Sequence, residues 1–329
     1  MKKKIKIKFV DFYDSFNTSD NDFIRVLNER YDVELSDNPD YIIYSGFGFK
    51  HLDYDCIRIF YTGECITPDF NQCDYAIGFD RLNFGDRYIR IPLYMLFQYK
   101  ESYLKLQHRK EFGEDFLAQK TGFCSFVYSN CFAQDLRTQM FEKLSQYKKV
   151  DSGGRYKNNI GGAVKDKNEF QSKYKFSIAF ENSSYDGYST EKIVESFAAG
   201  TIPIYYGDPL IANDFDERAF VNCHRYKSLE DVIERVKEID QDDRLYLEMM
   251  SIPPVKVALT SLNDFMYHIF DMDLHEARRR PHSIPSNGLE AMLKRHSFFE
   301  TYIYSYYRKG LNQIERYKTG TMLTKKRTK

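Results

Sequence analysis

The sequence predicts an α/β protein with two doubly wound, Rossmann-like domains that face a cleft. Segments typical of buried strands alternate with amphipathic helices in residues 5–61 and again in residues 123–239. Such alternation is typical of parallel sheets covered by helices. The chain of 329 residues is longer than one average domain, and the charged stretch 100–120 has the weak periodicity of a connector. We therefore expect domains at 1–118 and 119–288, followed by a basic, aromatic, helical C-terminal tail at 289–329.

The first domain begins with apolar residues that alternate with lysines in residues 5–9. This pattern predicts a strand and not a secretory signal peptide, whose apolar run is uninterrupted. A helix is expected at 22–30, and strands are expected at 41–44 and 57–61. The last of these strands runs into a Thr-Gly-Glu turn. Glu64 therefore falls at the rim of the first domain, facing the cleft.

The second domain repeats the rhythm around a polar centre. Its expected elements are strand 123–128, helix 134–144, helix 167–172, a strand over 176–180, a helix opened by 190–192, strand 201–206, a strand near 220–221 and helix 229–239.

Polar residues gather in 182–189, between a buried strand and a helix. Ligands of open α/β sheets bind at the carboxyl ends of strands, near helix N-termini that favour phosphate. Lys192 in the first helical turn would add a positive charge for a diphosphate, and Glu191 could accept hydrogen bonds from a sugar diol. A bare Thr-Glu-Lys triplet is common on solvated helices, but the density of polar residues before it favours a binding site.

Charge and cysteines bear on partners and compartment. The formal net charge is zero, yet residues 278–329 hold 13 Lys and Arg against 3 acidic residues. A basic segment interleaved with aromatics favours an anionic membrane surface, with a helix packed on the body as the alternative. No nucleic-acid module accompanies it. The six cysteines form no CxxC pair or regular framework, which indicates free thiols in a reducing compartment, and no apolar run is long enough to span a bilayer.

Several motifs resemble those of one enzyme family and occur in its order. They are F-E-N-S-x(4)-Y-x-T-E-K-I at 180–193, T-I-P-I-Y-x-G-x-P at 201–209, F-Y-T-G-E at 60–64, D-Y-A-I-G-F-D at 74–80, R-I-P-L-Y at 90–94 and S-F-V-Y-S-N at 125–130. These motifs resemble the signature of the α1,3/α1,4-fucosyltransferases of glycosyltransferase family ten, especially the bacterial members. Long, ordered matches are more specific than one short motif.

The resemblance implies a GT-B-type pair of domains, the first on the acceptor side and the second binding GDP-fucose. It implies inverting transfer from GDP-β-L-fucose, with Glu64 as the general base that takes the proton of the acceptor hydroxyl. From position alone, Asp74 and Asp80 are alternative carboxylates. Tyr61 would border the transferred sugar.

The resemblance also assigns residues to the donor. Arg137 and Lys192 would stabilise the β-phosphate of the leaving GDP, a task that a divalent metal performs in other enzymes. Glu191 would contact the ribose, and Asn182 and Tyr188 would make further donor contacts.

Metal signals are weak. Three D-x-D triplets, the metal–nucleotide motif of other glycosyltransferases, begin at Asp53, Asp214 and Asp271. With 48 acidic residues such triplets arise by chance, and the seven histidines form no HExxH motif. We therefore expect no metal and no cofactor beyond the donor substrate.

The expected acceptor is the 3-OH of GlcNAc in an N-acetyllactosamine-type glycan of a Lewis-type bacterial surface polysaccharide. The expected location is the bacterial cytoplasm, with the tail as an attachment to the inner face of the cytoplasmic membrane. The alternatives are a GT-B transferase for another GDP-sugar and a catalytically silent sugar-nucleotide-binding protein. The presence of Glu64 together with Arg137, Glu191 and Lys192 favours catalysis, because a binding protein has no use for a base. Tyr206 departs from the family pattern, which commonly has Trp there.

Overall fold

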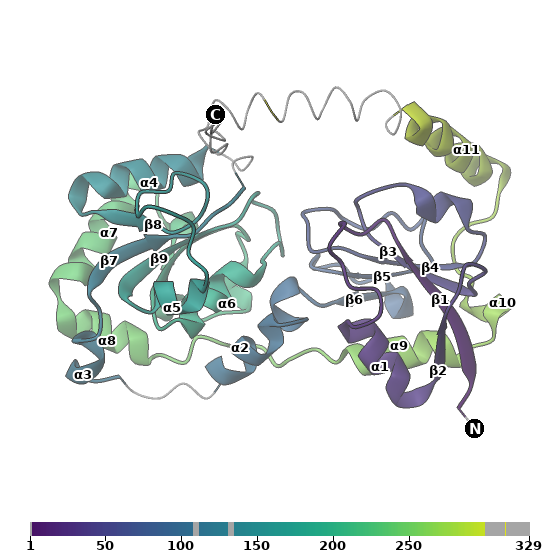
Figure 1. Ribbon diagram of the computed structural model, residues 1–329, viewed down its shortest axis with the longest axis horizontal. Helices are drawn as coiled ribbons and strands as arrows, with labels where there is room; N and C mark the ends of the chain where they lie inside the picture. Colours follow the sequence, from purple (N-terminus) through teal and green to yellow (C-terminus); the bar gives the residue numbers. More distant parts are fainter. Residues whose placement is uncertain (1, 108–111, 131–134, 300–312, 314–329) are drawn as a thin grey trace, which may run out of the picture. The chain divides into compact units, whose positions relative to one another are not determined.

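The computed structural model describes residues 2–107, 112–130, 135–299 and 313. They form two compact units (Figure 1). Unit 1 comprises residues 2–97 together with 259–299, and unit 2 comprises the described residues of 98–258. Each unit contains its own parallel sheet with helices, so the predicted α/β class is confirmed.

Unit 1 has a six-stranded parallel sheet in the order β2-β1-β3-β4-β5-β6. The strands are β1 (Lys4–Val10), β2 (Asp32–Leu35), β3 (Tyr41–Tyr44), β4 (Ile57–Tyr61), β5 (Tyr75–Gly78) and β6 (Tyr88–Arg90). β3 and β4 lie at the centre of the sheet and every residue in them is buried. Their apolar runs therefore behave as central parallel strands, which are covered on both faces. The predicted bounds of both strands agree with the structure.

Helix α1 (Asp22–Arg30) also has the predicted bounds. It begins there because the Asn21 side chain caps it and accepts a hydrogen bond of 3.0 Å from the Ile24 amide. The other described α-helices of unit 1 come from residues 259–299: α9 (Leu262–Asp271), α10 (Leu274–Ala277) and α11 (Ile284–Phe299). α9 packs against α1, and Tyr31 donates a hydrogen bond of 2.6 Å to Asp271.

Unit 2 has a five-stranded parallel sheet in the order β11-β10-β9-β7-β8. Its strands are β7 (Gly122–Phe126), β8 (Val150–Ser152), β9 (Tyr174–Phe180), β10 (Ile202–Tyr206) and β11 (Val221–Asn222). Its helices are α2 (Tyr99–Leu106), α3 (Glu114–Leu117), α4 (Leu136–Tyr147), α5 (Lys167–Gln171), α6 (Glu191–Ala198), α7 (Leu229–Gln241) and α8 (Asp243–Ser251). The predicted apolar stripe of α6 is buried at Ile193, Val194 and Phe197.

The structure corrects the prediction that residues 100–120 form a connector without regular structure. Residues Tyr99–Leu106 form helix α2, which packs against α6. Tyr103 is fully buried and donates a hydrogen bond of 2.6 Å to the Val257 carbonyl. Weak periodicity concealed this helix because only a narrow face of it is apolar.

The predicted domain boundaries at 118 and 288 also differ from the observed units. The chain returns to unit 1 at residue 259, before the predicted boundary, and α11 begins before the predicted start of the tail at 289. The predictions for residues 300–312 and 314–329 of that tail lie outside the described residues.

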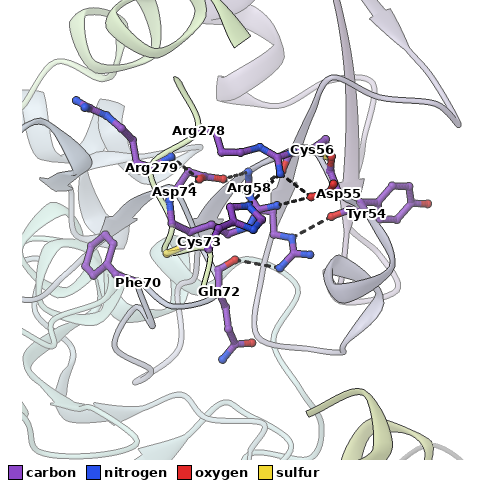
Figure 2. Close-up of polar contacts among 12 residues, drawn as sticks. Tyr54, Asp55, Cys56, Arg58, Phe70, Gln72, Cys73, Asp74, Arg278 and Arg279 are labelled. Carbon is purple, nitrogen blue, oxygen red and sulfur yellow. Dashed lines mark hydrogen bonds and ion pairs between the residues drawn. The ribbon is translucent and has the colours of Figure 1, made fainter. Parts of the chain in front are cut away.

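A buried polar network fastens the returning chain to the sheet of unit 1 (Figure 2). Asp74 is fully buried, and its carboxylate accepts hydrogen bonds of 2.7 and 2.8 Å from the amides of Arg279 and Arg280. The Arg280 guanidinium also pairs with it, and the Arg58 amide donates to it at 2.8 Å. A buried carboxylate with this many donors is a structural anchor.

Candidate active site

The expected donor residues of unit 2 lie in the loops and helices that follow neighbouring parallel strands. β9 stands between β7 and β10, and the carboxyl ends of parallel strands meet at one edge of a sheet. β9 leads through loop 181–190 into α6, and β7 leads into α4, which carries Arg137. The topology therefore brings together residues that are far apart in sequence.

Arg137 and Asn182 are in direct contact. Nη1 of Arg137 donates a hydrogen bond of 3.2 Å to Oδ1 of Asn182, and Nη2 donates to the carbonyl of Asn130. The guanidinium lies 4.1 Å from the centre of the Tyr128 ring, a cation–π contact, and the side chain is 2 % exposed. Arg137 is thus held in a fixed orientation at this edge and is not a surface ion-pair residue.

Lys192 is surrounded by oxygen atoms. Its Nζ lies 2.8 Å from Oε2 of Glu181, 2.7 Å from Oγ1 of Thr190 and 3.3 Å from Oε1 of Glu191. Burial alone would lower the pKa of Lys192, but the charges of Glu181 and Glu191 raise it well above its usual range. The lysine is therefore a permanent positive charge at the N-terminus of α6.

Glu191 is charged as well. Burial by itself would raise the pKa of this carboxyl, but Lys192, Lys167 and its own backbone amide lower the pKa to about 2. An ionised carboxylate accepts hydrogen bonds only, which suits contact with a sugar diol.

Glu181 is a site residue that sequence reasoning missed. Its side chain is 2 % exposed, and Oε1 accepts a hydrogen bond of 2.7 Å from the Thr190 amide while Oε2 accepts one of 2.6 Å from the Thr190 hydroxyl. Because it also pairs with Lys192, it fixes both the start of α6 and the ammonium group. The available signal was its place in the F-E-N-S motif, directly after a buried strand.

Gly207 is required by the same carboxylate. A Cβ at this position would lie 2.4 Å from Cγ of Glu181, closer than two carbon atoms approach. The loop that bears Tyr188 is fastened by Asp208, whose Oδ1 accepts a hydrogen bond of 2.8 Å from the Gly187 amide. Tyr188 is itself buried. At the position where family members commonly have Trp, the ring of Tyr206 stacks on His224 at 4.6 Å.

The remaining two expected residues belong to unit 1. Glu64 follows β4 and its carboxylate is exposed, without a hydrogen bond or ion pair to any described residue. Tyr61 is buried in an aromatic cluster, with ring centres 5.2 Å from Phe23 and 5.8 Å from Phe97. The structure thus divides the seven expected residues, with five in unit 2 and two in unit 1.

The two alternative carboxylates have different surroundings. The buried carboxylate of Asp74 is occupied by hydrogen bonds from Arg58, Arg279 and Arg280, so Asp74 is no longer a candidate base. Asp80 follows β5 and is 8 % exposed, and its Oδ2 has no hydrogen-bond partner among the described residues. Burial raises the pKa of Asp80 to about 6. Asp80 therefore retains the chemistry of a base.

The D-x-D triplets have structural partners. Asp55 pairs with Arg278 at 2.6 Å, Asp216 with Arg218 at 2.7 Å and Asp271 with Arg30 at 2.7 Å. In the described part of the chain no three His, Cys, Asp or Glu side chains are grouped closely enough to hold a metal ion. Within the same residues no helix has the length and apolarity needed to cross a membrane, and the five described cysteines are free.

Comparison with known proteins links both units to one family. The model of the α-(1,3)-fucosyltransferase FucT N-terminal domain matches residues 7–97, and that of the C-terminal part of glycosyltransferase family 10 (fucosyltransferase) matches 117–251. The chain is 36% identical over 273 residues to α-(1,3)-fucosyltransferase FucT of Helicobacter pylori, which covers 70% of this chain and 55% of that relative. The chain thus spans about half the length of this curated relative.

Two solved structures are similar across nearly their whole length. A crystal structure of an α1,3-fucosyltransferase has a TM-score of 0.74 at 28% identity and covers 86% of this chain and 94% of its own. A structure of an α1,3-fucosyltransferase with GDP-fucose has a TM-score of 0.68 at 29% identity and covers 86% and 93%. The two family models lie one in each unit and together match more than half of the residues. The chain belongs to glycosyltransferase family 10, the fucosyltransferases.

Proposed function

We propose that this protein transfers L-fucose from GDP-β-L-fucose to the 3-OH of GlcNAc in N-acetyllactosamine-type glycans, with inversion at the anomeric carbon. One observation supports the proposal most strongly. At the strand ends of unit 2, Arg137 donates a hydrogen bond to Asn182, and Lys192 forms an ion pair with Glu191. These are the residues that the family motifs assign to the donor. The name of the Helicobacter pylori relative supports the 3-linkage, and the solved relative with GDP-fucose supports the donor.

The proposed base is Glu64 of unit 1. Its exposed carboxylate takes the proton from the acceptor hydroxyl while that oxygen attacks the anomeric carbon. The bond between the anomeric carbon and the β-phosphate oxygen breaks on the opposite face, and GDP leaves with the bonding electrons. Tyr61, which ends the same strand, is the proposed neighbour of the fucose. Asp80 is the alternative base.

Unit 2 stabilises the negative charge that develops on the departing GDP. Negative charge grows on the β-phosphate as the bond breaks, and fixed positive groups in a buried setting stabilise it strongly. Arg137 and Lys192 are such groups, and both are largely buried. Glu191 accepts hydrogen bonds from the ribose hydroxyls, and Asn182 and Tyr188 complete the donor contacts. The reaction needs no metal in this proposal because the two cations take its place.

The proposed location of the enzyme follows from its acceptor and from its basic C-terminal segment. The enzyme acts in the bacterial cytoplasm on a precursor of Lewis-type surface polysaccharide, and the basic segment 289–329 contacts the anionic inner face of the membrane. The support for this segment is its sequence, in which basic residues alternate with aromatics. Packing against unit 1 is the rival role, and the pair between Glu290 and Arg58 favours it for the start of the segment.

A donor screen tests the proposal. The purified protein is incubated with N-acetyllactosamine and, separately, with GDP-fucose, GDP-mannose, UDP-galactose and UDP-glucose, and the products are weighed by mass spectrometry. Only GDP-fucose should add a deoxyhexose. Addition of another sugar from a GDP donor would identify a different GDP-sugar transferase. Tight GDP-fucose binding with no product would identify a silent binding protein.

A further inference from the structure

Unit 1 exposes three large apolar side chains just after its central strands. Tyr13 follows β1, Phe47 follows β3 and Ile66 follows β4, and they are 52%, 50% and 41% exposed. These strands are direct neighbours in a parallel sheet, so the three loops leave the same edge. We call Tyr13, Phe47 and Ile66 the apolar rim.

Contacts join the members of the apolar rim. The rings of Tyr13 and Phe47 meet edge to face, with centres 5.9 Å apart and planes at 80°. Ile66 lies over the backbone beside Phe47, because a Cβ on Gly46 would fall 2.6 Å from Cδ1 of Ile66. The rim is therefore one continuous surface and not three scattered residues.

Asp11 holds the rim in place. Its backbone has a φ of 58°, and its carbonyl accepts a hydrogen bond of 3.0 Å from the Phe47 amide. Its buried carboxylate accepts further bonds of 2.9 and 2.8 Å from the amides of Lys50 and His51. The loops that carry Tyr13 and Phe47 are thus tied together. Rings that stay exposed on a fixed backbone are organised in advance for a ligand.

Glu64 stands in the same turn as Ile66. The Ile66 amide donates a hydrogen bond of 2.8 Å to the Glu64 carbonyl, and the Glu64 amide donates one of 3.1 Å to the Thr62 hydroxyl. A molecule that packs on Ile66 therefore lies next to the Glu64 turn.

The charge of the loops around the apolar rim limits the class of ligand that can bind there. Loops 11–20, 45–49 and 62–66 hold four acidic residues and no Lys or Arg. A phosphate, nucleic acid or anionic membrane would be repelled. A neutral sugar chain fits, because pyranose rings present apolar C–H faces to aromatic rings and hydroxyls to polar side chains. Ser15, Asn17 and Thr18, in the loop that carries Tyr13, are exposed and can make such hydrogen bonds.

We propose that the apolar rim binds the acceptor oligosaccharide, with a sugar next to the fucosylated one packed on Tyr13 and Phe47. This assignment rests on the proposed function. It makes the rim a determinant of acceptor affinity that is separate from the donor residues of unit 2.

The test measures the acceptor KM, kcat and the Kd for GDP in Tyr13→Ala, Phe47→Ala and the double variant, with N-acetyllactosamine as the acceptor. Each lost ring should raise the acceptor KM by roughly threefold to tenfold, the range of one aromatic contact. The kcat at saturating acceptor and the Kd for GDP should remain at wild-type values. Tyr13→Phe, which keeps the ring, should keep the wild-type KM.

Leu274→Ala is the matched control. Leu274 is 49% exposed but lines a pocket with Pro39 and Cys56, which precede β3 and β4, so it lies at the opposite edge of the sheet. The proposal is overturned if the double variant keeps an acceptor KM within about twofold of the wild type, as Leu274→Ala should. It is also overturned if the variants change only self-association in sedimentation. If the wild type itself transfers no fucose, the proposed function fails, and that outcome is read before any variant is compared.

Discussion

Three carboxylates of this chain differ in what surrounds them, and the surroundings separate their roles. Glu64 is exposed and has no described partner, which leaves it able to take a proton. Glu181 is buried and holds Thr190 and Lys192. Asp80 is buried, and its Oδ2 has no hydrogen-bond partner among the residues that the structure describes. Each can be tested by a substitution that keeps the shape of the side chain.

Glu64→Gln should lower turnover by roughly 10²–10⁴-fold, because the amide cannot accept the proton of the acceptor hydroxyl. The Kd for GDP should stay unchanged, since the proposed GDP contacts belong to unit 2. Steady-state kinetics and calorimetry measure the two quantities. Near-normal turnover would remove Glu64 from the mechanism and leave Asp80 as the base.

Glu181→Gln should lower turnover by roughly tenfold to a hundredfold, the range seen when a partner that orients a site residue is lost. The amide can still accept from Thr190, but the charge that holds Lys192 is gone. GDP affinity should fall as well, which calorimetry would detect. Glu195→Gln is the control, because this carboxylate of α6 pairs with Lys167 near the surface. Equal losses in both variants would show that Glu181 has no special part.

Asp80→Asn should stabilise unit 1 at neutral pH and have no effect in acid. The folded-state pKa of about 6 lies above the ordinary value, so the folded protein holds the proton more tightly than the unfolded chain. The cost of the buried charge is absent below about pH 4 and complete above about pH 6. Hydrogen exchange of β5 amides at both ends of this range measures the difference. A variant as stable as the wild type at every pH would contradict the raised pKa.

At the scale of elements, residues 259–299 are part of unit 1. Asp74 binds the amides of Arg279 and Arg280, and Arg58, which is 1 % exposed, pairs with Glu290 of α11 at 3.2 Å (Figure 2 shows the surroundings of Arg58). Helix α11 is therefore attached to the sheet through a buried guanidinium. A membrane role of the later tail has to be measured with this helix retained.

A chain that ends after residue 288 should lose about 1–3 kcal/mol of unit 1 stability, because Arg58 is left without the carboxylate of Glu290. A chain that ends after residue 299 should keep the stability that the Glu290–Arg58 pair supplies. Hydrogen exchange of β4 amides measures this difference in stability. The chain that ends after residue 299, which keeps α11, is also the form to compare with the full chain in vesicle sedimentation. Glu290→Gln in the full chain should reproduce part of the loss, while Glu276→Gln, on an exposed position of α10, should not. If the β4 amides exchange equally slowly in all of these forms, α11 does not stabilise the sheet of unit 1.

At the scale of the whole molecule, the proposed labour is divided: unit 1 carries the base and unit 2 the groups that stabilise GDP. Two cations of unit 2 would do the work of a metal, and the D-x-D triplets pair with arginines. This division predicts how the enzyme responds to chelation.

EDTA should leave the activity of the wild type unchanged, whereas Arg137→Ala should lose about 2.7–4 kcal/mol of transition-state stabilisation. Initial rates with GDP-fucose, with and without EDTA followed by Mg²⁺ or Mn²⁺, measure the first effect. The ratio of kcat/KM values gives the second. Complete loss with EDTA that a metal restores would contradict the metal-independent mechanism.

The α/β class, the bounds of α1, β3 and β4, and the motifs that place the chain in its family are all predictable from the amino-acid sequence. These signals are local, because periodicity, caps and motifs depend on residues close together in the chain. Four features become visible only in the folded chain: the anchor at Asp74, the contact between Arg137 and Asn182, the contacts of Glu181 and the return of residues 259–299 to unit 1. Each of these joins groups that are distant in sequence, and a local pattern carries no information about which distant partner a side chain meets when the sheet forms.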